Sequence, residues 1–143
     1  MSVAKNYAAV SVGAVAGGGV RLAFDAILPH TATEFPWSTL IINVVGAFAL
    51  ASLVGGLWQR ASTPDWVKAG AGPGLLGSFT TFSAVMASLV LEGAAGEWLL
   101  GASYLAATLV LGFGAAVAGL RIGIAMTERR LATDASTEER GTE

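Results

Sequence analysis

Four long apolar segments, separated by short polar stretches, account for most of the chain. Three of them, residues 35–59, 69–91 and 98–120, carry no charged residue over 25, 23 and 23 positions. Each exceeds the roughly 20 apolar residues that a helix needs to cross a bilayer. The uncharged part of the first segment, residues 6–20, is shorter. A full crossing there has to include Arg21, whose long side chain reaches toward the membrane interface.

The pattern predicts an all-α integral membrane protein with four transmembrane helices in one domain, residues 1–132, and a disordered polar tail, residues 133–143. The spans are expected at about residues 4–28, 37–58, 68–92 and 97–127. A cleaved signal peptide is the alternative for the first segment, but that segment extends past Arg21 and three further spans follow it. Composition agrees, because only 13% of the residues are charged, against roughly 25% in a soluble domain.

Glycines recur four residues apart within three of the spans. The pairs are Gly13 with Gly17, Gly70 with Gly74, and Gly119 with Gly123. Small residues at this spacing allow two helix backbones to approach closely. The pairs therefore predict tight helix packing in the bundle rather than a binding site.

The third apolar segment contains helix-breaking residues at its centre. Pro73 and several glycines lie within residues 70–77, and the chain continues as Gly77-Ser78-Phe79-Thr80-Thr81-Phe82-Ser83. Lipid cannot satisfy the backbone N–H and C=O groups that a broken helix frees. Such a break persists only where protein buries it or where it lines a polar cavity. The third helix is therefore expected to be broken near its centre and to form an ion or substrate site.

The side chains around this break suit a small anion in transit. Thr80, Thr81 and Ser83 offer hydroxyl groups, and Phe79 and Phe82 offer ring edges, which carry the positive end of the ring quadrupole. Several weak contacts of this kind permit throughput where a lysine would bind an anion too tightly. The freed backbone carbonyls, in turn, could hold a cation.

Polar residues on the other helices supply candidate partners for the break. Thr39 and Asn43 are four residues apart and share a helix face, where Asn43 is either interhelical glue or a contact for a permeant species. Tyr104 and Thr108 could back the same polar seam. Arg21 is either an anchor at a helix end or a cation at the mouth of an anion path.

The sequence gives no indication of an enzyme or of a nucleic-acid partner. It contains no carboxylate pair, metal-ligand cluster, nucleotide-binding loop or nucleophile triad, and it has no cysteine. Its net charge of −2 comes without a basic patch. The chemistry that remains is transport or assembly within the lipid bilayer.

Positive charges are unevenly divided between the two ends of the predicted bundle. Only Arg21 lies on one side. Seven lie on the other: Lys5, Arg60, Lys68, Arg121, Arg129, Arg130 and Arg140. By the positive-inside rule, both termini are cytoplasmic and the orientation is fixed.

The motifs resemble the Fluc (CrcB) family of fluoride channels, small bacterial membrane proteins of four helices. The resemblance covers about residues 4–126 and rests on Gly18-x-x-Arg21, Asn43-x-x-Gly46 and Gly77-x-x-Thr80-Thr81-Phe82-Ser83. It implies a channel in the bacterial plasma membrane that exports cytoplasmic fluoride passively and so reduces fluoride toxicity.

The resemblance also implies an assembly and a role for each site residue. Family members form antiparallel dimers with two fluoride pathways and a structural sodium ion at the dimer axis. The carbonyls of Gly77 and Thr80 would hold the sodium, and Arg21 would lie at the vestibule. The fluoride pathway would comprise Asn43, Phe82, Thr39, Ser83, Thr81 and Tyr104.

Two departures from the family pattern bear on the assembly. The family usually has a phenylalanine where this chain has Val85, and commonly a glutamate where it has Ser88. An antiparallel homodimer also needs one sequence that inserts in both directions, which a bias of seven positive charges to one opposes. The hypothesis is a heterodimer with a second family member. The rival is a homodimer in which one phenylalanine per subunit suffices.

Two other functions compete with the channel. A small proton-coupled multidrug exporter needs a titrating carboxylate deep in its first helix, and the candidate here, Asp25, lies near the helix end. A non-transporting membrane assembly protein would explain the glycines but not the polar centre of the third span.

Overall fold

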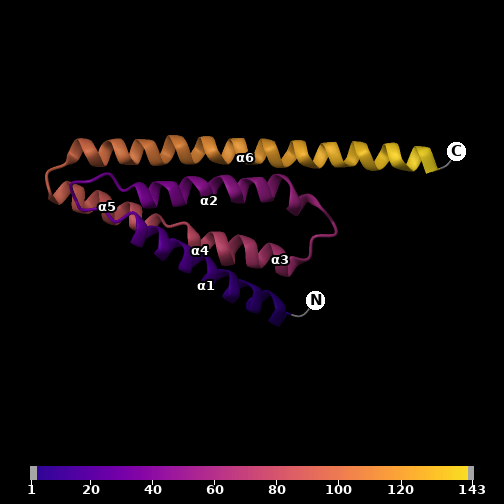
Figure 1. Ribbon diagram of the computed structural model, residues 1–143, viewed down its shortest axis with the longest axis horizontal. Helices are drawn as coiled ribbons and strands as arrows, with labels where there is room; N and C mark the ends of the chain where they lie inside the picture. Colours follow the sequence, from indigo (N-terminus) through magenta and orange to yellow (C-terminus); the bar gives the residue numbers. More distant parts are fainter. Residues whose placement is uncertain (1–2, 142–143) are drawn as a thin grey trace.

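The computed structural model describes residues 3–141, with side chains described for residues 3–133. This part of the chain is helical apart from its connecting loops and contains no strand (Figure 1). Four helical stretches are long and apolar enough to cross a membrane: Val3–Ile27, Trp37–Gln59, Asp65–Ala94 and Trp98–Thr133. The prediction of an all-α protein with four spans is confirmed.

The four spans run alternately in opposite directions (Figure 1). The first is α1 (Val3–Ile27), and the second is α2 (Trp37–Gly55) with a short 3-10 turn, η1 (Leu57–Gln59). The last is α6 (Trp98–Gly141), which follows a tight turn where Gly96 adopts a φ of 82°. The beginning of α1 and the end of α6 therefore lie toward the same end of the molecule, as expected for an even number of spans that alternate in direction.

The third span is divided into four pieces. They are α3 (Asp65–Ala69), a π-helical stretch η2 (Gly70–Leu76), a single turn α4 (Gly77–Phe79), and α5 (Phe82–Ala94). The helix is interrupted at Thr80 and Thr81, whose ψ angles of 156° and 122° are extended. The prediction of a break near the centre of this span is confirmed, but the glycine-rich stretch before it stays helical.

The wide turns of η2 explain how Pro73 is accommodated. Proline lacks an N–H and its ring crowds the preceding turn, so it normally kinks an α-helix. A π-helical turn spaces the backbone partners further apart and relieves that clash. The expected helix breaking at residues 70–77 is thus replaced by a local widening, and the chain leaves the helix only after Phe79.

Glycines on α2 and α6 let the two parallel helices lie in contact. A Cβ atom on Gly119 would collide with the carbonyl of Phe48, and one on Gly123 would collide with the carbonyl of Ser52. Both pairs advance together along the chain, which places α6 alongside α2 in the same direction. The predicted packing role of this glycine pair is confirmed.

Glycines also allow close contact between α1 and η2. A Cβ on Gly13 would collide with the carbonyl of Gly70, and one on Gly17 with the carbonyl of Leu75. Phe24, two turns further along α1, stacks edge-on against Phe79 with ring centroids 6.4 Å apart. One face of α1 therefore follows the third span up to the break.

The end of α6 differs from the sequence prediction. The structure continues this helix to Gly141, whereas a disordered tail was expected from Thr133 onward. No glycine or proline lies between Gly123 and Gly141, and Ala, Leu, Glu and Arg in this stretch favour helix. A helix that is already formed extends without a new nucleation cost, which accounts for the continuation.

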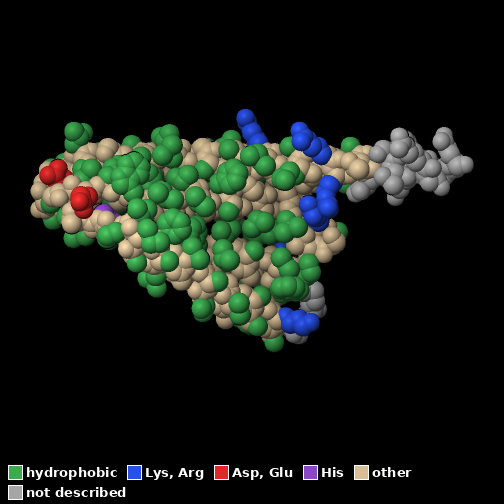
Figure 2. Space-filling view, in the orientation of Figure 1, with side chains coloured by type: hydrophobic (Ala, Val, Ile, Leu, Met, Phe, Trp, Pro, Cys, Tyr) green, Lys and Arg blue, Asp and Glu red, His purple; other side chains and the backbone are tan. Residues whose placement is uncertain are grey.

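Charged side chains lie mainly at the two ends of the molecule. Figure 2 shows Lys and Arg gathered toward the end at which α6 finishes, acidic side chains at the opposite end, and a hydrophobic surface between them. This distribution matches a bundle whose middle faces lipid. The chain is a multi-pass membrane protein.

Candidate functional site

The break in the third span is held by the side chain of Asn43 on α2. The backbone N–H of Thr81 donates to Asn43 Oδ1 at 2.8 Å, and Asn43 Nδ2 donates to the Thr81 carbonyl at 2.9 Å. One amide side chain therefore satisfies both polar groups of the residue at which the helix is interrupted. Because lipid offers no such partners, Asn43 supplies what a broken helix in a membrane requires.

Threonine side chains complete the two helix ends at the break. The Thr80 hydroxyl donates to the Leu76 carbonyl at 2.8 Å and so closes the last turn before the break. The Thr81 hydroxyl accepts the N–H of Ala84 at 3.2 Å, as an N-cap of α5. Threonine is a common N-cap residue because its oxygen satisfies an N–H that the first turn leaves unpaired.

Because of these bonds, two backbone carbonyls lose the N–H groups that would bond them in a continuous helix. In a continuous α-helix the carbonyl of Gly77 would accept from Thr81 N–H, and that of Thr80 from Ala84 N–H. Thr81 N–H instead bonds Asn43, and Ala84 N–H bonds the Thr81 hydroxyl. The break thus frees the carbonyls of Gly77 and Thr80 from their helical partners. Oxygens of this kind are the ligands that hard cations accept.

Gly46 lies one turn after Asn43 and makes room for the break. A Cβ atom on Gly46 would collide with the Thr80 side chain and approach the ring of Phe79. The spacing of Asn43 and Gly46 thus has a physical reason, since one binds the interrupted residue and the other allows it to approach α2.

Two open hollows flank the break, with volumes of about 540 and 310 Å³. Asn43, Ala47 and Thr80 line both of them. The larger extends along η2, and the smaller extends along α5, where Phe82 and Val85 line it. The break is therefore accessible from two sides of the single chain.

Phe82 and Ser83 point away from the bundle at the start of α5. The Phe82 side chain is 75% exposed, although it follows directly after the buried Thr81. The Ser83 hydroxyl lies 3.2 Å from that of Thr81. Asn43, Thr81, Phe82 and Ser83 thus lie together at the break.

Thr39 and Tyr104 form a second polar group, inside the bundle. Tyr104 is fully buried and Thr39 is nearly so. The Tyr104 hydroxyl lies near the side chains of Thr39 and Thr108 but makes no well-formed hydrogen bond with either. Its ring stacks edge-on against Phe35 at 5.5 Å. The structure thus separates these two predicted pathway residues from the surface hollows at the break.

The two positions that depart from the family pattern are both buried on α5. Val85 packs with Leu40 and Tyr104 in the core. Ser88 lies one turn further along, with its hydroxyl 3.5 Å from Nε2 of His30. The ring expected at position 85 would therefore lie between the buried tyrosine and the smaller hollow.

Arg21 lies on the face of α1 that follows the third span. It is four residues after Gly17 and three before Phe24, both of which contact that span. Its side chain is half-buried, and its Nε has no hydrogen-bond partner among the described residues. Asp25, by contrast, is exposed near the end of α1.

Sequence reasoning missed a buried carboxylate near the end of α5. Glu92 is 1% exposed, and neither of its oxygens has a hydrogen-bond partner among the described residues. With Ser88 and His30 it lines a small cavity of about 50 Å³. The signal was available, because Ser88 and Glu92 are four residues apart at the end of an apolar run and so share a helix face.

The fold and the break together define a class of protein. A polar, interrupted helix at membrane depth, buttressed by a side chain from a neighbouring span, is typical of small membrane proteins that handle ions or solutes. The family model described as CrcB-like protein, Camphor Resistance (CrcB), matches residues 8–120, which include every predicted site residue. The chain belongs to the CrcB family.

Curated relatives agree with this assignment. A protein of Granulibacter bethesdensis is 35% identical over 118 residues, covering 82% of this chain and 93% of that protein. One of a Roseiflexus species is 31% identical over 119 residues, with the same coverage of both. A third, of a Chelativorans species, is 42% identical over 76 residues, covering 52% of this chain and 61% of that protein. All three are named fluoride-specific ion channel FluC.

Proposed function

We propose that this chain is a subunit of a fluoride-specific ion channel that lets cytoplasmic fluoride leave the cell passively and so reduces its toxicity. The relatives that it resembles over most of its length are named as such channels. The observation that carries the proposal within the structure is the break at Thr80 and Thr81, which is held by Asn43 and adjoins an exposed Phe82. An ion channel is not an enzyme, and the chain needs no catalytic group.

The break offers an anion weak contacts and no fixed positive charge. Phe82 lines the smaller hollow, and the edge of its ring would offer an anion the positive end of the quadrupole. The hydroxyls of Thr81 and Ser83 are 3.2 Å apart. Asn43 uses one N–H for the Thr81 carbonyl, which leaves its second amide proton for an ion in the adjoining hollow. Thr39 and Tyr104 would extend this track into the bundle, and Arg21 would attract anions at its vestibule.

The donor set at the break fits a structural sodium ion. The carbonyls of Gly77 and Thr80 have lost their helical donors to Asn43 and to the Thr81 hydroxyl. Sodium, when bound, would supply positive charge that fixes this interrupted backbone. Gly77 is exposed, so its carbonyl is also available to an ion shared with a second subunit.

The assembly that this function requires is an antiparallel dimer. Phe82 is exposed on the single chain and lines an open hollow, so a second subunit would enclose it and complete the pathway. Seven of the eight Lys and Arg residues lie on one side of the predicted topology, which favours both termini in the cytoplasm of the bacterial cell. It also favours an oppositely biased family member as the partner over a second copy of this chain.

Fluoride efflux from liposomes that contain only the purified chain tests the function. A fluoride electrode would report efflux, with chloride as the comparison ion. Fast efflux that is selective for fluoride would establish the channel. If the chain alone is inactive, co-reconstitution with a second CrcB-family protein should restore efflux. Absence of efflux under both conditions would contradict the proposal.

A matched pair of variants tests the role of Phe82. Phe82→Ile removes the ring edge at the break, whereas Phe113→Ile changes an equally exposed phenylalanine on α6, since the two side chains are 75% and 76% exposed. We expect Phe82→Ile to slow efflux about tenfold or more, the effect of losing roughly 1.4 kcal/mol along the path. Phe113→Ile should leave it unchanged. Equal rates in the two variants would remove Phe82 from the pathway.

A further inference from the structure

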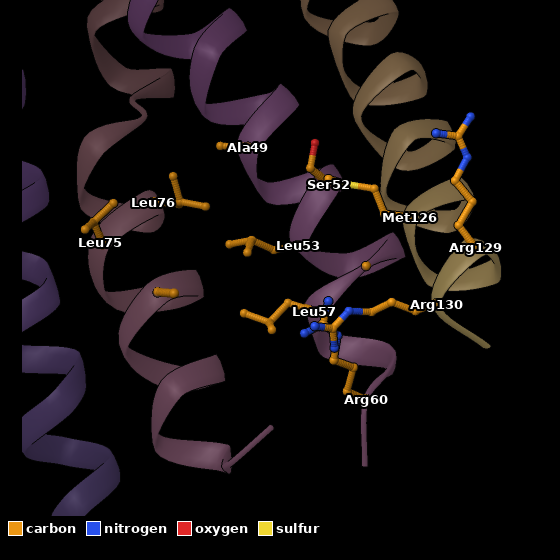
Figure 3. A pocket seen from close by; sticks show the side chains of 12 residues that line it. Ala49, Ser52, Leu53, Leu57, Arg60, Leu75, Leu76, Met126, Arg129 and Arg130 are labelled. Carbon is orange, nitrogen blue, oxygen red and sulfur yellow. The ribbon is translucent and has the colours of Figure 1, made fainter. Parts of the chain in front are cut away.

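A further hollow of about 780 Å³ lies between α2, η2 and α6, and neither Thr80 nor Thr81 lines it (Figure 3). Its walls are mainly apolar side chains from all three elements. They include Leu53 and Leu57 from the second span, Leu75 and Leu76 from η2, and Met126 from α6. A surface hollow of this size and composition is shaped for a hydrocarbon chain rather than for water.

Arginines form the mouth of this hollow. Arg60, Arg129 and Arg130 line it, and none of the described residues that line it is acidic. Figure 3 shows the side chains of Arg60 and Arg130 pointing toward one another from different elements, with Arg129 turned aside. Two guanidinium groups that converge repel each other unless an anion lies between them. Guanidinium groups bind phosphate in paired hydrogen bonds.

The depth of the mouth corresponds to the level of lipid headgroups. Arg60 follows directly after the second membrane-spanning stretch, Trp37–Gln59, and Trp58 lies two residues before it. Tryptophan and arginine at a span end are typical of the membrane interface. A phosphate placed between Arg60 and Arg130 would thus lie where phospholipid headgroups lie, with the apolar hollow extending below it toward the bilayer centre.

We propose that this hollow is a binding site for one anionic glycerophospholipid. Its phosphate bridges Arg60 and Arg130, and an acyl chain lies along Leu53, Leu57 and Leu76. A free phosphate ion would meet the two arginines but would gain nothing from the apolar walls. A zwitterionic lipid would fit the walls but would bring its own cation beside the arginines. An anionic phospholipid satisfies both features, and basic pockets between membrane helices commonly bind the headgroups of such lipids.

Native mass spectrometry of the full chain tests the site, with phosphatidylglycerol and phosphatidylcholine as the probes. The wild-type chain is expected to retain one phosphatidylglycerol preferentially. The double variant Arg60→Gln/Arg130→Gln is expected to retain it about tenfold less. The control is Arg121→Gln on the same helix, an exposed arginine that does not line the hollow, and its retention should match the wild type. Circular dichroism of each variant checks that it is folded.

Three outcomes would overturn the proposal. Equal retention of both lipids would remove the charge selectivity. If millimolar inorganic phosphate displaced phosphatidylglycerol and raised the melting temperature as much as the lipid does, the arginines would be a site for a free anion. If the double variant changed its elution volume in size-exclusion chromatography and retained lipid as the wild type does, a second subunit rather than a lipid would cover the hollow. Ala71→Leu adds a test of the walls, because filling the hollow while keeping both arginines should also reduce retention.

Discussion

At the scale of single residues, the break depends on one asparagine. Asn43 both accepts from and donates to the backbone of Thr81. An amide side chain offers a neutral donor and a neutral acceptor at this reach, whereas an aspartate carboxylate has no proton to donate and the side chain of serine or threonine is shorter. Asn43 therefore has a structural role between helices, whether or not it also lines a pathway, because it holds the segment that carries the candidate pathway.

Replacing Asn43 by alanine should destabilise the protein by about 2–4 kcal/mol. The change leaves the N–H and C=O of Thr81 unpaired, at roughly 1–3 kcal/mol for each group, with water in the adjoining hollows offsetting part of the loss. Unfolding in mixed micelles of increasing sodium dodecyl sulfate content would measure it. Asn6→Ala is the control, since Asn6 Oδ1 has no hydrogen-bond partner among the described residues. Equal effects of the two changes would contradict the role of Asn43.

The sequence indicated the residues of the break better than their partners. The run from Gly77 to Ser83 and the position of Asn43 marked the site, because polar groups within an apolar span are conspicuous. The pairing of Asn43 with Thr81 joins residues 38 positions apart, and only helix packing determines it. The spacing of Ser88 and Glu92 marks a shared helix face, but the enclosure of the Glu92 carboxylate depends on the loop that carries His30 and is not visible in that spacing.

At the scale of helices, the glycines act mainly in packing. The stretch Gly70–Leu76 stays helical, although its composition predicts breakage. The chain leaves the helix only at Thr80, where Asn43 provides partners that the glycines themselves do not have. Composition indicates where a helix is weak, but the actual break lies where a neighbouring helix can satisfy it. That second condition is not visible in one segment of sequence.

Gly119→Ala should destabilise the contact between α2 and α6. The new methyl group would collide with the Phe48 carbonyl, a backbone atom that cannot move aside without separating the helices. Gly114→Ala on the same helix meets nothing within 4 Å and should be neutral or stabilising by up to about 1 kcal/mol through helix propensity. Thermal unfolding followed by size-exclusion chromatography would compare them. A melting temperature of Gly119→Ala at or above that of Gly114→Ala would contradict the packing.

The loop between α1 and α2 should respond to acid. Glu34 Oε2 accepts from the N–H and the hydroxyl of Thr31, at 2.8 and 3.0 Å. The backbone hydrogen bond first, and then the hydroxyl, lower the pKa of Glu34 below its ordinary value. Since the folded pKa is the lower one, these bonds stabilise the loop above the ordinary pKa and are lost as pH falls through the folded one.

The amide proton shift of Thr31 would report this titration by NMR. We expect its midpoint to lie on the acid side of an ordinary glutamate, and Glu34→Gln should abolish the titration while the rest of the spectrum is retained. The carboxylate is fully exposed, so the global melting temperature should change little. A midpoint at or above the ordinary value would show that the hydrogen bonds do not form in the membrane-embedded protein.

At the scale of the whole molecule, the fold follows from the sequence more completely than the site does. Three apolar runs of sufficient length, with a fourth that crosses only when Arg21 is included, predict the number of spans, and the direction of each span then alternates. The glycine pairs on α1 and α6 also indicate the close contacts that the structure contains. The exposure of Phe82 and the open hollows beside it, in contrast, follow from how the helices pack around the break, and no single segment of the sequence specifies that packing.

The orientation of the chain gives the most direct test of which partner it takes. The chain has no cysteine, so one introduced cysteine is a unique label. Ser62→Cys lies in the exposed loop between the second and third spans, and Thr33→Cys in the exposed loop between the first and second. A membrane-impermeant maleimide applied to intact cells should label Thr33→Cys and spare Ser62→Cys, because the positive-inside rule predicts that the Ser62 side faces the cytoplasm.

Permeabilised cells provide the control, since both variants should then be labelled equally. An antiparallel homodimer requires half of the chains in each orientation, so each variant would be labelled to about half in intact cells. That result would overturn the single orientation and, with it, the need for a second family member. Labelling of Thr33→Cys alone would mean that an antiparallel pore has to recruit an oppositely oriented chain, because every copy of this one would face the same way.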